Sequence, residues 1–599
     1  MSENLVPASA QPWRTAITCA VFAALFGLLA YRLHHLQVEQ AGHFSDLGER
    51  QRSRVWRIKA SRGEVLDARG NPLVVSGGMW NLYADPGYMN DKLATMVALE
   101  RILGAGRDEL RDEFTAKGNG RLIAENVSDE QATALRTWMD LYREEHHGRY
   151  LEGLTLRRSY QRKYVHGDMA QHILGFVLDD GTGGAGIEQA CDQYLRGHDG
   201  RETLSVDARG RPLISSSGER LAARQGADVQ LTIEVAIQHE LQEALLEAVT
   251  KHKAAGAAGI VVRPATGQIV AMASWPTFSL TDFGSADPAS FRNNALAFVY
   301  ESGSTMKPLV AGAAVADGVA GWDTVIDCEN GSWTYRHGRS KRTIHSHPHG
   351  RLTVLQGIAK SDNILMAKLG IELGPERLYD WIHRFGFGRA TGLELPGEDA
   401  GIVLPRKRWN LLGSCMSVPM GHELAVTPLQ MAMAHAAIAN DGVWQPPRII
   451  KRIYMREGDG AETDLNVPLL RPDPRRVFSK ANADAIERAM METMTTGTGK
   501  RSQLEGWTSA GKTGTTEKLV NGKYSKESHI GSFVAWAPAG HDVRPKYLCL
   551  VVVDDPRANG HYGSQTGAPV VKRVLQFALD NEPGARPDLD QAPDAEGAP

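Results

Sequence analysis

The feature that most constrains the fold of this chain is one uncharged stretch close to its N-terminus. Residues 15–31, TAITCAVFAALFGLLAY, contain no Asp, Glu, Lys, Arg or His, and their number lies at the short end of the range for a bilayer-spanning helix. Leucines at helical spacing continue through Arg32 to Leu36, beyond the point at which a signal peptide would be cleaved. We therefore predict a membrane anchor with a helical extension over residues 15–36. A cleaved signal peptide is the alternative.

The remainder of the chain has the composition of an ordinary globular protein. Of 599 residues, 42% are hydrophobic and 23% are charged, and the formal net charge is -3. This length exceeds what one hydrophobic core supports, so two or more domains are expected. The small net charge argues against a general polyanion binder, and we expect no nucleic acid partner.

The five cysteines lie far apart in the sequence. Their total is odd and they form no C-x-x-C pair, which argues against a zinc knuckle and against a dense disulfide framework. We predict that they behave as small hydrophobic side chains in the core: Cys19, Cys191, Cys328, Cys415 and Cys549.

Composition and periodicity divide the rest of the chain into two domains and a tail. Residues 51–225 mix short strands, glycine turns and a polar helical stretch from Asp91 to Glu145, and we predict one α+β domain there. Residues 228–580 form the second domain. The tail at 581–599 is rich in Pro, Asp, Ala and Gly, and we predict that it is disordered.

The second domain shows strand patterns at both of its ends. A long amphipathic helix at 234–254 leads into AGIVVRPATGQIVAMAS, which predicts two strands joined by a turn. Much later come the strand patterns WTSAGKTGT, HIGSFVAWAPA and YLCLVVVDD, with Asn521-Gly522 at a hairpin and a closing helix at 570–578. The intervening residues are mainly helical. This order predicts an α+β fold in which strands from the beginning and the end of the domain form one sheet, and helices flank it.

A serine and a lysine three positions apart stand at the start of an apolar helix, in YESGSTMKPLV at 300–310. Pro308 is tolerated only near a helix start, and the apolar residues after it predict a buried helix with Ser304 at its N-terminus. Residues three apart share a face, so the amine of Lys307 can reach the hydroxyl of Ser304. A buried lysine loses affinity for its proton and can act as a general base. Taken alone, the motif equally fits a capping serine beside a solvent-exposed lysine.

Two further motifs change this interpretation. Ser361-Asp362-Asn363 lies between two apolar helical runs, and Lys512-Thr513-Gly514 ends a predicted strand beside a hairpin. In this order, S-x-x-K, S-D-N and K-T-G form the signature of penicillin-binding proteins and class A β-lactamases, which the chain therefore resembles.

The residue types predict their roles. Ser304 would attack a carbonyl carbon, with Lys307 as the general base. Ser361 would relay a proton to the leaving amine, and Asn363 would hydrogen-bond an amide of the substrate.

The third motif suits a substrate that carries a free carboxylate. Lys512 adds positive charge, and Thr513 and Thr515 add hydroxyl donors. Gly514 would let the substrate approach the strand edge closely. The backbone N–H groups of Ser304 and Thr515 would form an oxyanion hole.

Over nearly the whole chain, from the anchor to about residue 580, the sequence resembles a class B penicillin-binding protein. The signatures RLHHLQ after the anchor, RGEVLD at 62–67, RSY at 158–160 and GGAGIE at 183–188 resemble the N-terminal pedestal of this family, which β-lactamases lack. Ala68, Gln161 and the stretch HYGS at 561–564 depart from its usual pattern.

The resemblance implies a penicillin-binding/serine β-lactamase-like transpeptidase domain, an antiparallel sheet flanked by helices plus an all-helical part, on a dimerisation-type pedestal. It implies a D-Ala-D-Ala transpeptidase that acylates its serine with a peptidoglycan stem peptide, passes the acyl group to a neighbouring amine, and is acylated by β-lactam antibiotics. Because peptidoglycan lies outside the cytoplasmic membrane, residues 1–14 would form a cytoplasmic tail. The chain would cross the inner membrane lipid bilayer once, with its bulk in the periplasm.

Two stretches, MGHELAVTPLQMAMAHAAIANDGV and TGTGKRSQLEGW, resemble the septal, FtsI-type branch more than the elongation branch. That branch implies a membrane glycan polymerase and divisome proteins as partners. Two alternatives on the same fold stay open. One is a hydrolase, either a β-lactamase or a D,D-carboxypeptidase, and the other is a non-catalytic β-lactam sensor or scaffold.

Three further patterns have simpler interpretations. We predict that His345-Ser346-His347-Pro348-His349 is a surface loop, and we expect no metal and no cofactor. Glu462-Thr463-Asp464-Leu465-Asn466 copies the E-x-x-L-N pattern of class A β-lactamases but lies too far beyond S-D-N, so it is a chance match. We predict core or rim positions for Trp275, Trp333 and Trp536.

Overall fold

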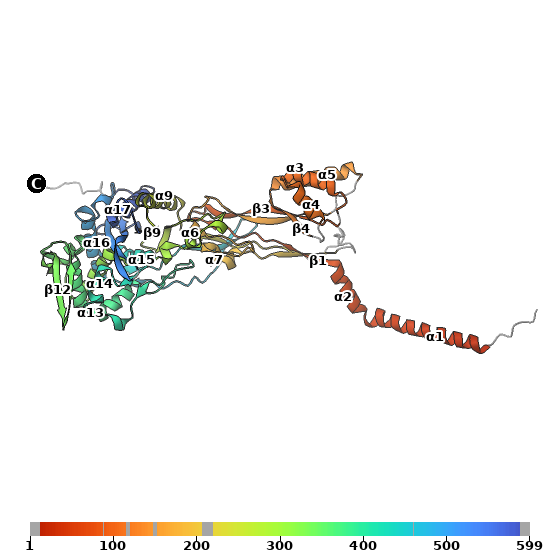
Figure 1. Ribbon diagram of the computed structural model, residues 1–599, viewed down its shortest axis with the longest axis horizontal. Helices are drawn as coiled ribbons and strands as arrows, with labels where there is room; N and C mark the ends of the chain where they lie inside the picture. Colours follow the sequence, from red (N-terminus) through yellow and green to blue (C-terminus); the bar gives the residue numbers. More distant parts are fainter. Residues whose placement is uncertain are drawn as a thin grey trace, which may run out of the picture. The chain divides into compact units, whose positions relative to one another are not determined.

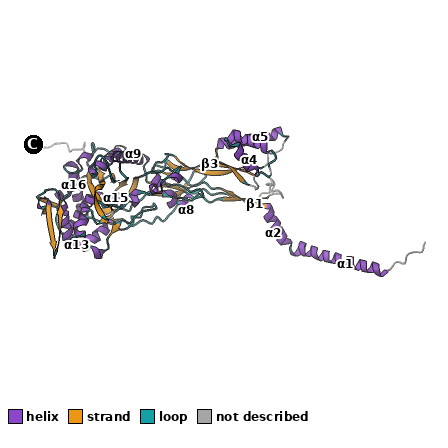
Figure 2. Ribbon diagram, viewed as in Figure 1, coloured by secondary structure: helices purple, strands orange, loops and turns teal. Residues whose placement is uncertain are grey.

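The computed structural model describes residues 12–87, 89–115, 120–147, 153–205, 220–458, 460–520 and 522–587. The internal contacts divide the chain into two units, residues 1–60 with 198–224, and residues 61–197 with 225–599. Figure 1 follows the chain from red at the N-terminus to blue at the C-terminus, and Figure 2 separates its helices from its strands.

The first unit contains the predicted anchor as helix α1 (Pro12–His34). This helix continues through a π-helical turn to Glu39. Within Pro12–Glu39 a window of 18 residues has a mean hydropathy of 1.9, so the helix is long and apolar enough to cross a membrane. Helix α2 (Ala41–Arg52) follows. A three-stranded antiparallel sheet completes the described part of the unit: β1 (Ser53–Ile58), β6 (Gly200–Ser205) and β7 (Arg220–Leu221).

In the second unit, a seven-stranded sheet joins segments from distant parts of the chain. Its long strand β3 pairs with β2, β4 and β5, and β8 lies parallel to β2. The far edge is formed by β18 and β19, which come much later in the sequence and which no sequence pattern linked to this sheet. The strands are β2 (Val65–Leu66), β3 (Pro72–Ala84), β4 (Arg121–Val127), β5 (Leu154–Tyr164), β8 (Asp228–Leu231), β18 (Ile450–Arg456) and β19 (Glu462–Asp464).

The stretch from Asp91 to Glu145, predicted to be helical, is only partly so. It contains α3 (Lys92–Leu103), α4 (Arg107–Thr115) and α5 (Asp129–Glu145), but strand β4 lies between α4 and α5. The polar strand β4 pairs with β3, and this pairing stabilises a strand although its residues alone have only a weak preference for one.

A buried ion cluster connects the RGEVLD and GGAGIE motifs. The carboxylate of Glu188 is fully buried and accepts hydrogen bonds from Arg62 Nε at 2.5 Å and Arg162 Nε at 2.8 Å. Arg62 also donates to Asp192 Oδ1 at 2.7 Å. Glu188 lies on the short helix α7 (Gly186–Ala190) and Asp192 on α8 (Asp192–Leu195), and the short helix α6 (Gln171–Leu174) precedes them.

The predicted two-ended sheet is present as five antiparallel strands in the order β10-β9-β23-β22-β21. The hairpin between β21 and β22 brings Val520 opposite Lys523, while Asn521 itself lies outside the described residues. Helices α9 (Val235–His252) and α18 (Ala568–Asp580) pack on one face of the sheet. The strands are β9 (Gly256–Arg263), β10 (Gln268–Trp275), β21 (Ala510–Val520), β22 (Lys523–Ala537) and β23 (Tyr547–Asp554).

A larger apolar core fills the other face of this sheet and is built mainly from helices. Helix α11 lies at its centre, and Figure 2 shows the helices gathered around the strands. The helices are α10 (Asn294–Ala297), α11 (Lys307–Ala316), α12 (Val354–Ala359), α13 (Asn363–Phe385), α14 (Ser414–Ser417), α15 (Pro428–Ala439) and α16 (Lys480–Thr495). This region also contains small two-stranded sheets: β11 (Val325–Asp327) with β14 (Arg351–Thr353), β12 (Ser332–His337) with β13 (Ser340–His345), β15 (Ile402–Val403) with β16 (Leu424–Ala425), and β17 (Val443–Trp444) with β20 (Arg475–Arg476).

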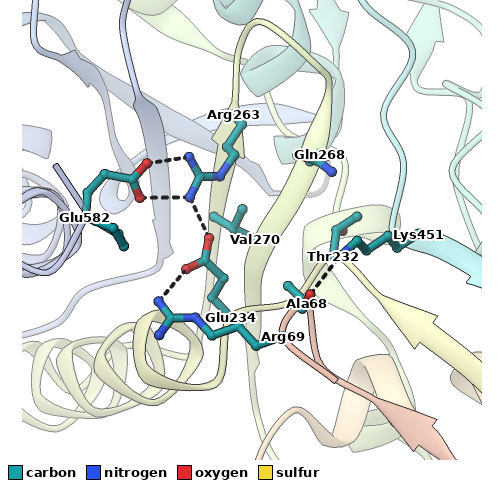
Figure 3. A pocket seen from close by; sticks show the side chains of 10 residues that line it. Ala68, Arg69, Thr232, Glu234, Arg263, Gln268, Val270, Lys451 and Glu582 are labelled. Atoms are coloured by element: carbon teal, nitrogen blue, oxygen red, sulfur yellow. Dashed lines mark hydrogen bonds and ion pairs between the residues drawn. The ribbon is translucent and has the colours of Figure 1, made fainter. Parts of the chain in front are cut away.

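The start of the tail predicted to be disordered makes specific contacts. Glu582 accepts two hydrogen bonds from the guanidinium of Arg263, at 3.0 and 2.9 Å, in a pocket of about 350 Å³ that Figure 3 shows. Arg263 also donates to Glu234 at 2.7 Å, so its charge is already balanced within this pocket. The composition of the tail did not predict the contact of Glu582, because its partner Arg263 lies far away in the sequence. Residues 588–599 lie outside the described residues.

Candidate active site

The predicted nucleophile stands where a short 3-10 turn, Gly303–Met306, leads into α11. Ser304 is partly exposed, whereas α11 is buried over its first two turns. Gly303 has a φ of 57°, and a Cβ at this position would lie 2.6 Å from Thr516 Cγ2 on β21. A glycine is therefore needed before Ser304, because the strand that carries K-T-G passes so close to the turn.

The amine of Lys307 is buried and hydrogen-bonded to the S-D-N motif. Its Nζ donates to the main-chain oxygen of Ser361 at 2.5 Å, to Asn363 Oδ1 at 2.7 Å and to Ser361 Oγ at 3.1 Å. Burial lowers the pKa of Lys307 to about 7, against the opposing effect of the Asp362 carboxylate. Among the described residues, no hydrogen bond joins Lys307 to Ser304.

Ser361 lies between the two lysines of the site. Its Oγ is 3.1 Å from Lys307 Nζ and 3.1 Å from Lys512 Nζ. Its φ of 58° is in the left-handed region, which costs a non-glycine residue about 1–2 kcal/mol. Strain of this kind persists only where the surroundings fix the backbone.

The middle residue of S-D-N fixes that backbone. Asp362 is fully buried and caps α13 by accepting a hydrogen bond from Leu365 N at 2.8 Å. It also accepts one from Ser346 Oγ at 2.8 Å, and His349 Nδ1 lies 3.1 Å away. Burial raises the pKa of Asp362, but these hydrogen bonds outweigh burial and hold the pKa below its ordinary value.

The K-T-G motif lies on β21, as predicted. Lys512 is fully buried, and burial together with the nearby amine of Lys307 lowers its pKa well below the ordinary value. The hydroxyls of Thr513 and Thr498 are 2.7 Å apart, and Thr515 Oγ1 accepts a hydrogen bond from Gly563 N at 3.0 Å.

A pocket of about 430 Å³ brings the motifs together. Six predicted site residues line it: Ser304, Lys307, Ser361, Asn363, Thr513 and Thr515. Lys512 and Gly514 do not. Lys512 reaches the site through its contact with Ser361 Oγ. A Cβ at Gly514 would lie 2.4 Å from Ser532 Oγ and 2.8 Å from Ser302 O, so the chain itself fills that space. The structure therefore gives Gly514 a packing role within the chain.

Sequence reasoning missed several residues around this pocket. The histidine-rich segment at 345–349 was predicted to be a surface loop, and His345, His347 and Pro348 are indeed exposed. What the pattern did not predict is that His345, Ser346 and His347 line the pocket. The segment lies at the site because hydrogen bonds join it to Asp362 and Asn363, and its own pattern does not indicate these partners. Lys360, Thr498, Tyr562 and Ser564 complete the lining. Thr498 belongs to TGTGK, so the resemblance was the one signal that pointed to it.

A buried histidine contacts the turn that carries Ser304. His435 on α15 is fully buried, and its Nε2 lies 2.9 Å from the main-chain oxygen of Thr305. Because a carbonyl oxygen only accepts, Nε2 carries the hydrogen, and Nδ1 has no partner among the described residues. Burial lowers the pKa of His435 to about 4, so the ring is neutral near pH 7.

The remaining sequence patterns lie away from the pocket. Glu462 pairs with Arg452 at 2.6 Å on the seven-stranded sheet, which confirms that its E-x-x-L-N match is due to chance. Trp536 is buried and donates to Glu487 at 2.8 Å, while Trp275 and Trp333 are partly exposed. Four cysteines are buried free thiols, and Cys19 in α1 is exposed.

Comparison with known proteins supports this geometry. The model of the penicillin binding protein transpeptidase domain matches residues 257–576, and that of the penicillin-binding protein dimerisation domain matches residues 57–231.

Individual relatives extend over almost the whole chain. The probable peptidoglycan D,D-transpeptidase PenA of Neisseria meningitidis is 28% identical over 572 residues, which cover 95% of this chain and 92% of the relative. The peptidoglycan D,D-transpeptidase FtsI of Escherichia coli is 29% identical over 580 residues, 95% of this chain and 91% of the relative. Penicillin binding protein 3 of Mycobacterium tuberculosis, solved in complex with aztreonam, superimposes with a TM-score of 0.65 at 25% identity, over 89% of this chain and 98% of that one. Since the first domain model alone matches more than half of its residues, this chain belongs to the penicillin-binding protein transpeptidase family.

Proposed function

We propose that this protein cross-links peptidoglycan stem peptides by serine acyl transfer, with Ser304 as the nucleophile. One observation carries the proposal. Ser304, Lys307, Ser361 and Asn363 come from two distant segments and line one pocket, and the hydroxyl of Ser361 also contacts Lys512 from a third. Relatives named peptidoglycan D,D-transpeptidase support the substrate class.

Lys307 is suited to remove the proton of Ser304. A pKa of about 7 leaves much of the amine neutral near pH 7. A neutral amine has two N–H bonds and one lone pair, and the oxygens of Ser361 and Asn363 at 2.5 and 2.7 Å can accept both N–H bonds. The lone pair then remains for the hydroxyl proton of Ser304, whose oxygen attacks the carbonyl carbon of the penultimate D-Ala.

Ser361 is suited to pass a proton to the leaving group. The tetrahedral intermediate collapses when its C–N bond breaks, and the departing amine of the terminal D-Ala needs one proton. Ser361 Oγ, between the amines of Lys307 and Lys512, can donate its own proton and recover one from a lysine.

The far wall of the pocket would hold the substrate. Thr513 and Thr515 would donate to the terminal carboxylate, and Lys512 would act on it from behind through its charge. Asn363 would hydrogen-bond a substrate amide. The backbone N–H groups of Ser304 and Thr515 would stabilise the oxyanion.

We further propose domain boundaries and a location that agree with this chemistry. Residues 1–14 would be cytoplasmic, 15–36 would cross the inner membrane, 51–225 would form the pedestal, and 228–580 would form the transpeptidase domain in the periplasm. The apolar span Pro12–Glu39 supports the single membrane crossing. Similarity to FtsI supports a septal role, with a membrane glycan polymerase and divisome proteins as partners.

The direct test gives the full-length protein in detergent a pentapeptide that ends in D-Ala-D-Ala, together with an amine acceptor. We expect release of D-Ala and a new amide product, and we expect neither from Ser304→Ala. Release of D-Ala without the amide would indicate a carboxypeptidase. Rapid opening of penicillin would indicate a β-lactamase, and either result would contradict the transpeptidase assignment.

A further inference from the structure

A strongly basic hairpin stands beside the pocket, and none of the roles proposed above uses it. Strands β12 and β13 and the residues after them, positions 332–351, contain five Lys and Arg and no Asp or Glu. The whole chain has a net charge of -3, so this local excess does not follow from composition. Figure 1 shows the hairpin at the margin of the helical region, near α13.

The two faces of this hairpin have different surroundings. Trp333, Tyr335 and Ile344 pack with buried residues of α13 and α14. Because side chains alternate along a strand, the opposite face points away from this cluster, and it carries Arg336 and Lys341, both exposed.

The pairing of β12 with β13 places two cationic side chains opposite each other. Arg336 lies directly opposite Lys341, and Arg339 lies in the connecting turn. Like charges in this position destabilise a hairpin. Among the described residues, no acidic side chain pairs with any of the three, whereas Arg342 on the packed face lies 3.8 Å from Glu423. An anionic ligand would remove the repulsion.

The exposed face extends from Arg336 and Lys341 to the active-site pocket. Thr334 and Thr343 come next, with their hydroxyls 2.8 Å apart, and His345 follows and lines the pocket that contains Ser304. From Lys341 to His345 a strand advances about 13 Å, the length of about four residues of extended peptide.

We propose that this face, defined as Thr334, Arg336, Lys341, Thr343 and His345 and called the acceptor face, binds the second stem peptide of the cross-linking reaction. Carboxylates of that peptide would lie against Arg336 and Lys341, and its amine would lie in the pocket. The amine nitrogen would form a bond to the acyl carbon, the ester bond to Ser304 would break, and an amine proton would return to the Ser304 oxygen. The inference rests on the proposed function. A phosphate polymer would match the charge but not the path into the pocket.

Binding is measured by fluorescence anisotropy on the full-length protein in detergent. The probe is a labelled tetrapeptide with one free side-chain amine and two carboxylates, and its matched control has both carboxylates amidated. We expect Arg336→Gln/Lys341→Gln to raise the Kd of the acidic peptide about tenfold, since each exposed charge contributes modestly. Lys407→Gln/Arg408→Gln, at exposed positions away from the pocket lining, controls for net charge and should keep the wild-type Kd. Thermal unfolding checks that both variants are folded.

Three results would overturn the proposal: an unchanged Kd in the hairpin variant, equal binding of the acidic and amidated peptides, or tighter binding of a glycerol phosphate oligomer than of the acidic peptide. Labelling of Ser304 by fluorescent penicillin is read in the same preparations. Peptide binding without labelling would contradict the proposed function alone. Labelling with an unchanged Kd would contradict the acceptor face alone.

Discussion

At the scale of single residues, the site depends on burying two amines together. Lys307 and Lys512 both contact the hydroxyl of Ser361, and burial lowers the pKa of each. Two buried ammonium groups so close would repel each other, so the arrangement favours loss of a proton from one of the two amines. This is the physical basis for proposing a lysine, and not a histidine, as the general base.

The reactivity of Ser304 should therefore depend on pH. Below the pKa of about 7 Lys307 is protonated and cannot act as a base, so we expect the acylation rate with penicillin to rise between pH 6 and 8 and then level off. Lys307→Arg, which stays charged, should lower the rate about 100-fold or more at every pH. Stopped-flow acylation of the full-length protein measures both, and a flat wild-type profile would argue against Lys307 as the base.

The strained backbone of Ser361 predicts a difference between two variants that both lack its hydroxyl. Ser361→Gly and Ser361→Ala should each slow acylation about 100-fold or more. Only glycine adopts a φ of 58° without strain, so Ser361→Gly should be about 1 kcal/mol more stable than Ser361→Ala. Chemical denaturation compares them, and equal stability would show that the strain is absent in solution.

At the scale of elements, three segments hold the site. The turn before α11 supplies Ser304 and Lys307, the junction of α12 and α13 supplies S-D-N, and β21 supplies K-T-G. The two helix starts are set by residues next to them: a proline lies in the first turn of α11, and Asp362 caps α13.

The buried ion cluster should support the N-terminal part of the second unit. Glu188→Ala leaves Arg62 and Arg162 buried without their carboxylate, and we expect a loss of about 3–5 kcal/mol in the free energy of unfolding. Asp108→Asn, which breaks an exposed ion pair with Arg111 on α4, should leave the denaturation midpoint unchanged. If both variants unfold at the same midpoint, the cluster is not a structural support.

Local patterns predicted most of these elements but not their long-range contacts. The strands of the five-stranded sheet and helices α9 and α18 follow from alternation and helical spacing, and the pocket follows from the motifs. Strand β4 was missed because its polar sequence is stabilised by pairing with β3. The position of the segment 345–349 at the pocket was missed because it depends on Asp362, a buried partner that its own sequence does not reveal.

At the scale of the whole molecule, the N-terminal helix differs from the rest of the chain in the apolar surface that it exposes. Helix α1 has no buried residue, and its exposed apolar side chains would be unfavourable in water. The five-stranded sheet, by contrast, is covered on both faces. The two parts can therefore be tested separately.

The anchor predicts how the protein fractionates. The full chain should stay with membranes after an alkaline wash, and a chain that lacks residues 1–39 should be recovered in the soluble fraction. N-terminal sequencing of the membrane-bound form should find the uncleaved N-terminal region. A processed N-terminus beyond residue 31 would instead support the signal peptide.

The most direct test of the central claim is mass spectrometry of the full-length protein after incubation with penicillin. We expect one covalent adduct with the mass of intact penicillin, which maps to the peptide that contains Ser304 and persists for many minutes. Ser304→Ala should carry none. An adduct on another residue, or no adduct on folded wild-type protein, would contradict the assignment of Ser304 as the acylated nucleophile.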